Sequence, residues 1–60
     1  MKRFEVLWYI EGDNDPQTKE FSTKQATLNF YMKHRNDKGC YGWWVTKRDS
    51  DWEIVEDIVY

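Results

Sequence analysis

The 60-residue chain is 18% aromatic, carries a formal net charge of −2, and contains one cysteine and one histidine. These counts exclude an internal disulfide and a structural zinc site built from four Cys and His ligands. No apolar run approaches the roughly 20 residues of a membrane span, and no apolar stretch typical of a signal peptide follows the N-terminus. Because an unpaired cysteine is typical of a reducing compartment, we expect one small cytoplasmic domain over residues 1–60, with no cofactor, metal or membrane partner.

Residues 4–11 are predicted to form the first strand, because their side chains follow a period of two. One face carries Phe4, Val6, Trp8 and Ile10, whereas Leu7 and Tyr9 belong to the other face. The Gly- and Asp-rich segment 12–16 is typical of a turn, and residues 17–21 are expected to return as a short second strand.

A helix is predicted from Thr23 to His34 or Arg35. Ser22 is expected to be the N-cap and to form a capping box with Gln25. At about 100° per residue, one side of this helix gathers residues expected to face the sheet, namely Thr23, Ala26, Thr27, Phe30, Tyr31 and His34. Basic residues at its C-terminal end would oppose the helix dipole.

Two further strands, Cys40–Arg48 and Trp52–Tyr60, are predicted to form a hairpin that closes about Asp49-Ser50. The expected cross-strand partners are Val45 with Ile54, Trp44 with Val55, Arg48 with Asp51 as an ion pair, and Lys47 with Trp52 as a cation–π pair.

The order of these elements predicts an α+β fold of two layers, with one helix on a three- or four-stranded, largely antiparallel sheet. We expect its core to contain Val6, Trp8, Ile10, Phe30, Val45 and Ile54.

The adjacent pair Trp43-Trp44 is the main indication of function. Successive strand side chains point to opposite faces, so both indoles cannot enter a core that lies on one side of the sheet. If the helix covers the face of Val45, Ile54 and Ile58, the outer face carries an apolar patch of Trp44, Val55 and Val59, joined by Leu7 and Tyr9. Such patches are typical of interfaces, where tryptophan and tyrosine are enriched.

These residues predict a non-enzymatic protein–protein interaction module, whose partner is an unidentified protein or, in a homodimer, a second copy. The expected anchors are Tyr9, Trp44 and Trp52, with Arg48, Glu56 and Asp57 as a polar rim. Phosphate-binding glycine loops, paired cysteines and nucleophile elbows are missing from the sequence. His34 and Cys40 are more simply interpreted as a helix-end residue and a small strand residue.

The alternative function is binding of single-stranded nucleic acid on an aromatic platform, with phosphate contacts from the basic residues Lys33, Arg35, Lys38, Lys47 and Arg48. Residues 21–48 contain six Lys and Arg against one acidic residue, whereas residues 49–60 contain five acidic residues and no Lys or Arg. The acidic segment and the low pI of about 5.2 make this alternative weaker.

In its length, aromatic density and single compact domain, the chain is similar to small proteins encoded by phages and prophages. This resemblance rests on composition and identifies no residues. It implies a modulator or inhibitor that acts on a host protein.

Overall fold

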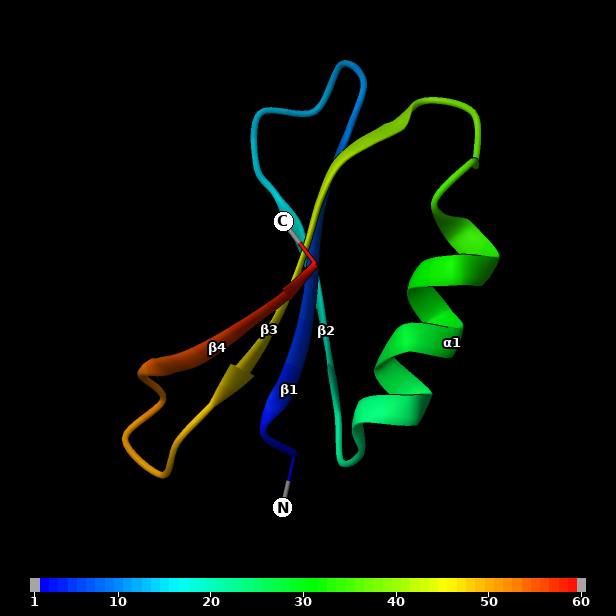
Figure 1. The fold of residues 1–60 in the computed structure, drawn as a ribbon. Coiled ribbons are helices and arrows are strands. Elements are labelled where there is room, and N and C mark those ends of the chain that lie inside the picture. Colours follow the sequence, from blue (N-terminus) through cyan, green and yellow to red (C-terminus); the bar gives the residue numbers. More distant parts are fainter. Residues whose placement is uncertain (1, 60) are drawn as a thin grey trace.

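The computed structural model describes residues 2–59 and has the order β-β-α-β-β. Its elements are β1 (Phe4–Ile10), β2 (Gln17–Phe21), α1 (Lys24–His34), β3 (Cys40–Arg48) and β4 (Ile54–Val59). The strands form one antiparallel sheet in the order β2-β1-β3-β4, and α1 packs on one face of this sheet (Figure 1). The predicted α+β class and the short second strand are confirmed.

The two central strands, β1 and β3, determine which side chains share a face. Val6 lies opposite Val45, and Leu7 lies opposite Trp44. The register shifts between Leu7 and Tyr9, because β3 contributes two residues, Gly42 and Trp43, opposite the single residue Trp8. An extra residue of this kind is a β-bulge, and it changes the face to which the following side chains point.

The core lies between the sheet and α1. Val6, Val45 and Thr27 are completely buried. Around them, an aromatic layer joins the sheet to the helix: the rings of Trp8 and Trp43 are stacked with centroids 5.1 Å apart, and Phe30 lies 5.4 Å from Trp8. The predicted inward positions of Thr27 and Phe30 on α1 are therefore confirmed.

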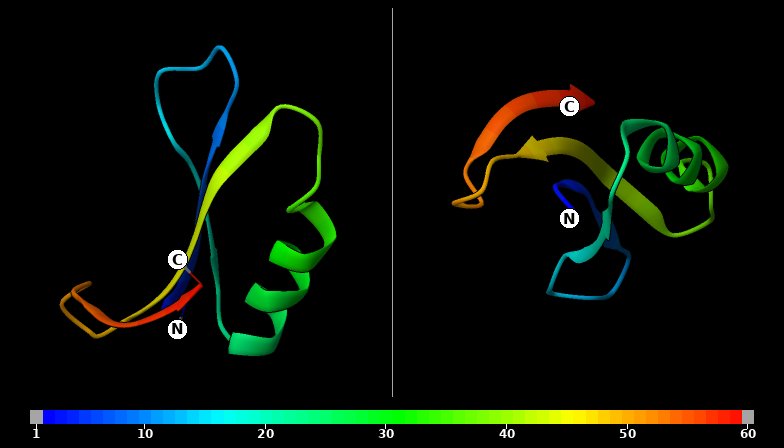
Figure 2. Two further views of the ribbon diagram at one scale, coloured as in Figure 1. Left: turned by 45° about the horizontal axis from the view of Figure 1, so that its top comes forward. Right: turned by 90° about the horizontal axis from the view of Figure 1, so that it is seen from below.

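Two residues expected in the core lie elsewhere. Ile10 is 37% exposed at the end of β1, opposite Cys40, the first residue of β3. Ile54 is 38% exposed at the start of β4, opposite Arg48. Ile54 shares the sheet face of its partner Arg48, which is the face opposite α1, so the helix does not cover it. The tip of the β3–β4 hairpin also bends away from α1 (Figures 1 and 2).

The helix begins one residue later than predicted. Thr23, not Ser22, is the N-cap, and its Oγ1 accepts a hydrogen bond from the Ala26 N–H at 3.2 Å. Gln25 does not form the expected capping box; its side-chain amide donates to Asn29 Oδ1 at 2.9 Å. Both residue types can cap a helix, and Thr23 has the extended backbone angles of an N-cap (φ −129°, ψ 152°).

The hairpin register differs from the prediction because its loop is longer. The Asp49 N–H donates to the Glu53 carbonyl, and the Trp52 N–H donates to the Asp49 carbonyl, both at 3.0 Å. The loop is therefore a β-turn over residues 49–52 that ends on a residue in the left-handed region, Trp52 with φ 64°. Asp49 Oδ1 also accepts from the N–H groups of Asp51 and Glu53, at 2.9 and 3.0 Å.

This loop and two bulges give the observed partners Val45–Val59, Thr46–Asp57, Lys47–Glu56 and Arg48–Ile54. The predicted partners Val45–Ile54 and Trp44–Val55 are wrong. So are the predicted Arg48–Asp51 and Lys47–Trp52 contacts: Arg48 pairs with Glu5 and lies over the Trp52 ring, while Lys47 lies 5.9 Å from the Phe4 ring centroid. The predicted end of the last strand, Tyr60, lies outside the described residues.

Within residues 2–59, no helix combines the length and the apolar character needed to cross a membrane.

Candidate functional site

The sheet face opposite α1, here called the open face, carries the candidate site. Trp8 and Trp43 contact the helix, so strand alternation turns their neighbours Leu7, Tyr9 and Trp44 to the open face. Pairing adds Tyr41, opposite Tyr9. This arrangement confirms that one of the two adjacent indoles packs inward and the other outward, and that Leu7 and Tyr9 accompany Trp44.

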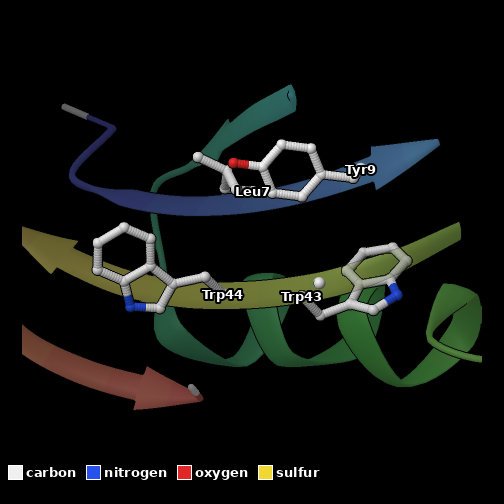
Figure 3. Close-up of a pocket in the computed structure, with 5 residues that line it drawn as sticks. Leu7, Tyr9, Trp43 and Trp44 are labelled. Atoms are coloured by element: carbon white, nitrogen blue, oxygen red, sulfur yellow. The ribbon is translucent and has the colours of Figure 1, made fainter. Parts of the chain in front are cut away.

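A shallow pocket of about 260 Å³ opens among these side chains. Leu7, Tyr9, Gly42, Trp43 and Trp44 line it. Figure 3 shows Leu7 and Tyr9 side by side on β1, and the indoles of Trp43 and Trp44 diverging from adjacent positions of β3. The pocket wall is therefore mainly aromatic and aliphatic.

Gly42 shapes the pocket through its backbone. Its φ of 68° is in the left-handed region, which glycine enters without steric cost. The Tyr9 ring lies so close that a Cβ on Gly42 would be 2.8 Å from Tyr9 Cδ2. Tyr9 also stacks on Tyr41, with ring centroids 5.8 Å apart. The bulge thus provides both the space for the Tyr9 ring and the outward direction of Tyr41.

Asp57 of β4 holds the Trp44 indole from the β4 side of the pocket. The indole Nε1–H of Trp44 donates to Asp57 Oδ1 at 2.8 Å. Asp57 is exposed and forms no ion pair within residues 2–59. Asp57 is therefore a hydrogen-bond acceptor for Trp44, separated from the pocket by the indole.

A second cluster on the open face surrounds Arg48. Its Nη2 group donates to Glu5 Oε1 at 3.1 Å, and its Nη1 group donates to the Trp52 carbonyl at 2.8 Å. The guanidinium carbon lies 5.5 Å from the centroid of the Trp52 ring. With side chains 16% and 11% exposed, Arg48 and Glu5 form a largely buried ion pair. This pair ties the hairpin end to β1.

Trp52 combines exposure with backbone strain. It is 37% exposed, and its φ of 64° is unusual for a bulky residue. The left-handed conformation costs roughly 1–2 kcal/mol for a residue with a Cβ. Such strain persists only where the surrounding contacts hold the residue, here the packing of Arg48 against the Trp52 ring.

The structure brings together most, but not all, of the predicted site residues. Tyr9 and Trp44 line the pocket, and Asp57 is bonded to the Trp44 indole. Arg48 and Trp52 form the second cluster on the same face. Arg48 occupies the interior of this cluster and not the polar rim. Glu56 is separate: it lies opposite Lys47, and its Oε2 is 3.9 Å from Lys24 Nζ at the start of α1.

The remaining members of the predicted outer patch are misplaced. Val59 lies opposite the fully buried Val45, on the helix side. Val55 falls within a bulge between the Lys47–Glu56 and Arg48–Ile54 pairs, and it is 55% exposed.

Sequence reasoning missed Gly42 and the 54% exposed Tyr41 as parts of the site. A glycine inside a strand pattern often marks a bulge, and this signal was present between Tyr41 and Trp43.

Among the charged side chains that the four strands place on the open face, three are acidic, namely Glu5, Glu20 and Asp57. Within the four strands, Glu20 lies opposite Glu5 on this face, and Asp57 lies opposite Thr46. Arg48 is the one basic side chain that these strands contribute to it. Lys19 and Lys47 lie opposite Val6 and Phe4 on the helix side.

His34 and Cys40, which were interpreted from the sequence as structural residues, lie at a helix end and in a strand. His34 Nδ1 lies 2.7 Å from Asp37 Oδ2 at the end of α1, and Cys40 is half-buried at the start of β3. No group of three or more His, Cys, Asp or Glu side chains in the described part of the chain is arranged to hold a metal ion.

Comparison of the sequence and structure with protein-family models, curated proteins and solved structures gives no match.

Proposed function

We propose that this chain is a non-enzymatic protein–protein interaction module that binds its partner through the open face. The observation that supports this proposal is the aromatic pocket beside the exposed Tyr41, on the sheet face that α1 leaves uncovered. Exposed aromatic residues next to a pocket are typical of the few side chains that supply most binding energy at interfaces. The short length of the chain and its similarity to small phage-encoded proteins favour a modulator or inhibitor of a host protein.

Stacking of single-stranded nucleic acid is the second candidate, because the Tyr9 and Tyr41 rings are already stacked on the open face. The acidic side chains of this face make it the weaker candidate, since they repel phosphate. The basic residues Lys33, Arg35 and Lys38 lie in and after the last turn of α1, not in the strands of this face.

The test is affinity capture from a bacterial lysate with the tagged protein, in nuclease-treated and untreated halves, with mass spectrometry as readout. Trp44→Ala is the test variant, and Met32→Ala is the matched control, because Met32 is 62% exposed on α1. We expect to capture a partner protein whose binding persists after nuclease treatment. This partner should bind the wild type and Met32→Ala equally well, and its binding to Trp44→Ala should be weaker by about 2 kcal/mol.

Circular dichroism checks that Trp44→Ala remains folded; if it unfolds, Tyr41→Ala replaces it as the test variant. Partners lost after nuclease treatment would support nucleic-acid binding instead. A protein captured equally well by the open-face variants would contradict the proposed surface.

A further inference from the structure

We propose that the outer edge of β2 receives an extended segment of the partner protein as an additional antiparallel strand, with an acidic residue opposite Lys19 and a basic residue opposite Glu20. This inference rests on the proposed function and specifies how the partner is held and which charges it carries. Strand addition of this kind draws its affinity from main-chain hydrogen bonds and its specificity from the side chains of the added strand.

The backbone of β2 is available for pairing along one side. β2 is an edge strand, with β1 as its neighbour, and its five residues pair with β1 without a register shift. In an antiparallel ladder, alternate residues direct both their N–H and C=O groups away from the neighbour. Among the described residues, no backbone hydrogen bond joins this outer edge to another segment. The helix α1 lies against one face of the sheet and not beyond β2 (Figures 1 and 2).

The other edge strand, β4, is a poorer template. Its pairing with β3 shifts register twice within six residues, between Val45 and Thr46 and between Lys47 and Arg48. Bulges bend and twist a strand, and they are one of the ways in which proteins protect sheet edges from further pairing. The regular edge of this sheet is therefore that of β2.

Lys19 and Glu20 give the edge of β2 its charge pattern. Because they are adjacent in a strand, they point to opposite faces: Lys19 lies opposite Val6 on the helix side, and Glu20 lies opposite Glu5 on the open face. Both are exposed, and neither forms an ion pair within residues 2–59. Unlike charges directly opposite each other stabilise an antiparallel pair, and like charges destabilise it. An added strand with an acidic residue followed or preceded by a basic one therefore matches both positions.

Lys19 also determines which strands are rejected. Its Nζ lies 5.4 Å from the Phe30 ring centroid and 5.8 Å from that of Phe21, so the side chain is directed toward α1 and leaves the backbone edge open. A lysine on an edge strand discourages pairing, because a neighbouring apolar strand would remove water from its charge. A carboxylate in the opposite position offsets this cost. The edge therefore selects a segment of matching charge over an apolar one.

The test is an NMR titration of the isotope-labelled protein with the peptide acetyl-Val-Lys-Glu-Thr-Val-amide, up to millimolar concentration. Antiparallel to β2, with its first residue opposite Phe21, this peptide places its lysine opposite Glu20 and its glutamate opposite Lys19. The control peptide, acetyl-Val-Glu-Lys-Thr-Val-amide, has the same composition and net charge with the two charges exchanged. We expect saturable shifts and slower hydrogen exchange at β2 amides, and about ten-fold weaker binding of the control, because two attractive pairs become repulsive.

A double variant tests the charge pattern from the side of the protein. Lys19→Glu combined with Glu20→Lys exchanges the two charges and keeps the net charge. We expect this variant to prefer the control peptide by about ten-fold, the reverse of the wild type. Lys38→Glu combined with Glu53→Lys is the matched control, because both residues are exposed and neither belongs to β1 or β2. It should keep the preference of the wild type, and circular dichroism checks that both variants are folded.

N-methylated peptides test the main-chain pairing. Alternate N–H groups of an added strand point toward β2. We therefore expect methylation of the backbone nitrogen at either the peptide lysine or the peptide glutamate to abolish binding, and methylation at the other residue to leave it. Binding of both methylated peptides would show that charges alone hold the peptide, and would overturn strand addition.

The inference is also overturned if β2 signals do not shift, if the two unmethylated peptides bind equally well, or if the charge-exchanged variant keeps the wild-type preference. Protection of β2 amides that rises with protein concentration in the absence of peptide would identify a second copy as the occupant instead. The peptide test needs no partner, so the two proposals fail separately. A protein captured through Trp44, together with an edge that ignores both peptides, would leave the proposed function standing without this inference. Selective peptide binding with no captured protein would do the reverse.

Discussion

Trp43 and Trp44 are chemically identical neighbours, but the structure gives them different environments. Trp43 stacks on Trp8 and meets Tyr31 edge-on, with ring centroids 5.8 Å apart, so it belongs to the layer between sheet and helix. Trp44 turns to the open face and bonds to Asp57. The first indole is therefore expected to matter mainly for stability, and the second mainly for binding.

For Trp43, we expect Trp43→Phe to cost about 1 kcal/mol and Trp43→Ala to cost about 3 kcal/mol. The Trp43 Nε1–H is buried with no acceptor among the described residues, so phenylalanine loses ring area but no hydrogen bond. Urea unfolding followed by circular dichroism measures both variants. Equal losses would show that the indole N–H has a partner.

For Trp52, we expect Trp52→Gly to be more stable than Trp52→Ala by about 1 kcal/mol. Alanine keeps the Cβ that is unfavourable at φ 64°, whereas glycine removes it, and both variants lose the contact with the Arg48 guanidinium. This order is the reverse of that expected in an ordinary strand. Thermal unfolding of the two variants tests it, and a more stable alanine variant would show that the loop relaxes out of this conformation.

At the scale of single elements, the bulge in β3 is the feature that builds the pocket. We expect Gly42→Ala to destabilise the fold by about 2 kcal/mol, because alanine is unfavourable at φ 68° and its Cβ would press on the Tyr9 ring. Gly12→Ala is the matched control: it has φ 86° but no atom within 4 Å of the added Cβ. Denaturant titrations compare the two, and equal losses would mean that the Tyr9 ring moves aside freely.

The Glu5–Arg48 pair holds the hairpin against β1, so we expect Arg48→Met to cost about 3 kcal/mol. The loss arises largely because Glu5 keeps a charge that is only 11% exposed. Adding Glu5→Gln to Arg48→Met should recover about half of the lost stability. A double-mutant cycle by urea unfolding measures this coupling; additive losses would indicate that the pair contributes no net energy.

The sequence was informative about elements and less so about their register. Alternation in β1 and the apolar spacing of α1 predicted which side chains face the core, because these periods follow directly from backbone geometry. The β3–β4 register failed because it depends on a five-residue turn in which Asp49 collects three local hydrogen-bond donors and Trp52 takes a position usually filled by glycine. Such side-chain contacts are not visible in a pattern of apolar and polar residues.

At the scale of the whole molecule, part of the candidate site could be predicted from the sequence. Tyr9 and Trp44 were expected on the outer face because alternation fixes them, and the structure places both at the pocket. Glu56 was assigned to the same surface only through the incorrect register. The contribution of Arg48 could not be read from the sequence, because its partner Glu5 is 43 positions away.

The acidic character of the open face also bears on self-association. Two copies that docked through this face would bring Glu20 and Asp57 of one copy near those of the other. We therefore expect the protein to be monomeric, with a melting temperature that does not change over about two orders of magnitude in concentration. Sedimentation equilibrium provides a second measurement. A melting temperature that rises with concentration would favour the homodimer.

The bulge at Gly42 makes β3 a strand with two phases. From Trp44 onwards, its side chains alternate in step with β1. Tyr41, three positions before Trp44, shares a face with it because the bulge accommodates one extra residue between them. Deletion of Gly42 would leave Trp43 alone opposite Trp8 and Tyr41 opposite Tyr9, so the two strands would pair in regular alternation with Tyr41 still on the open face. Such a deletion would keep the aromatic side chains of the open face and remove the left-handed glycine that lies against the Tyr9 ring, so it would isolate what the bulge itself adds to the pocket.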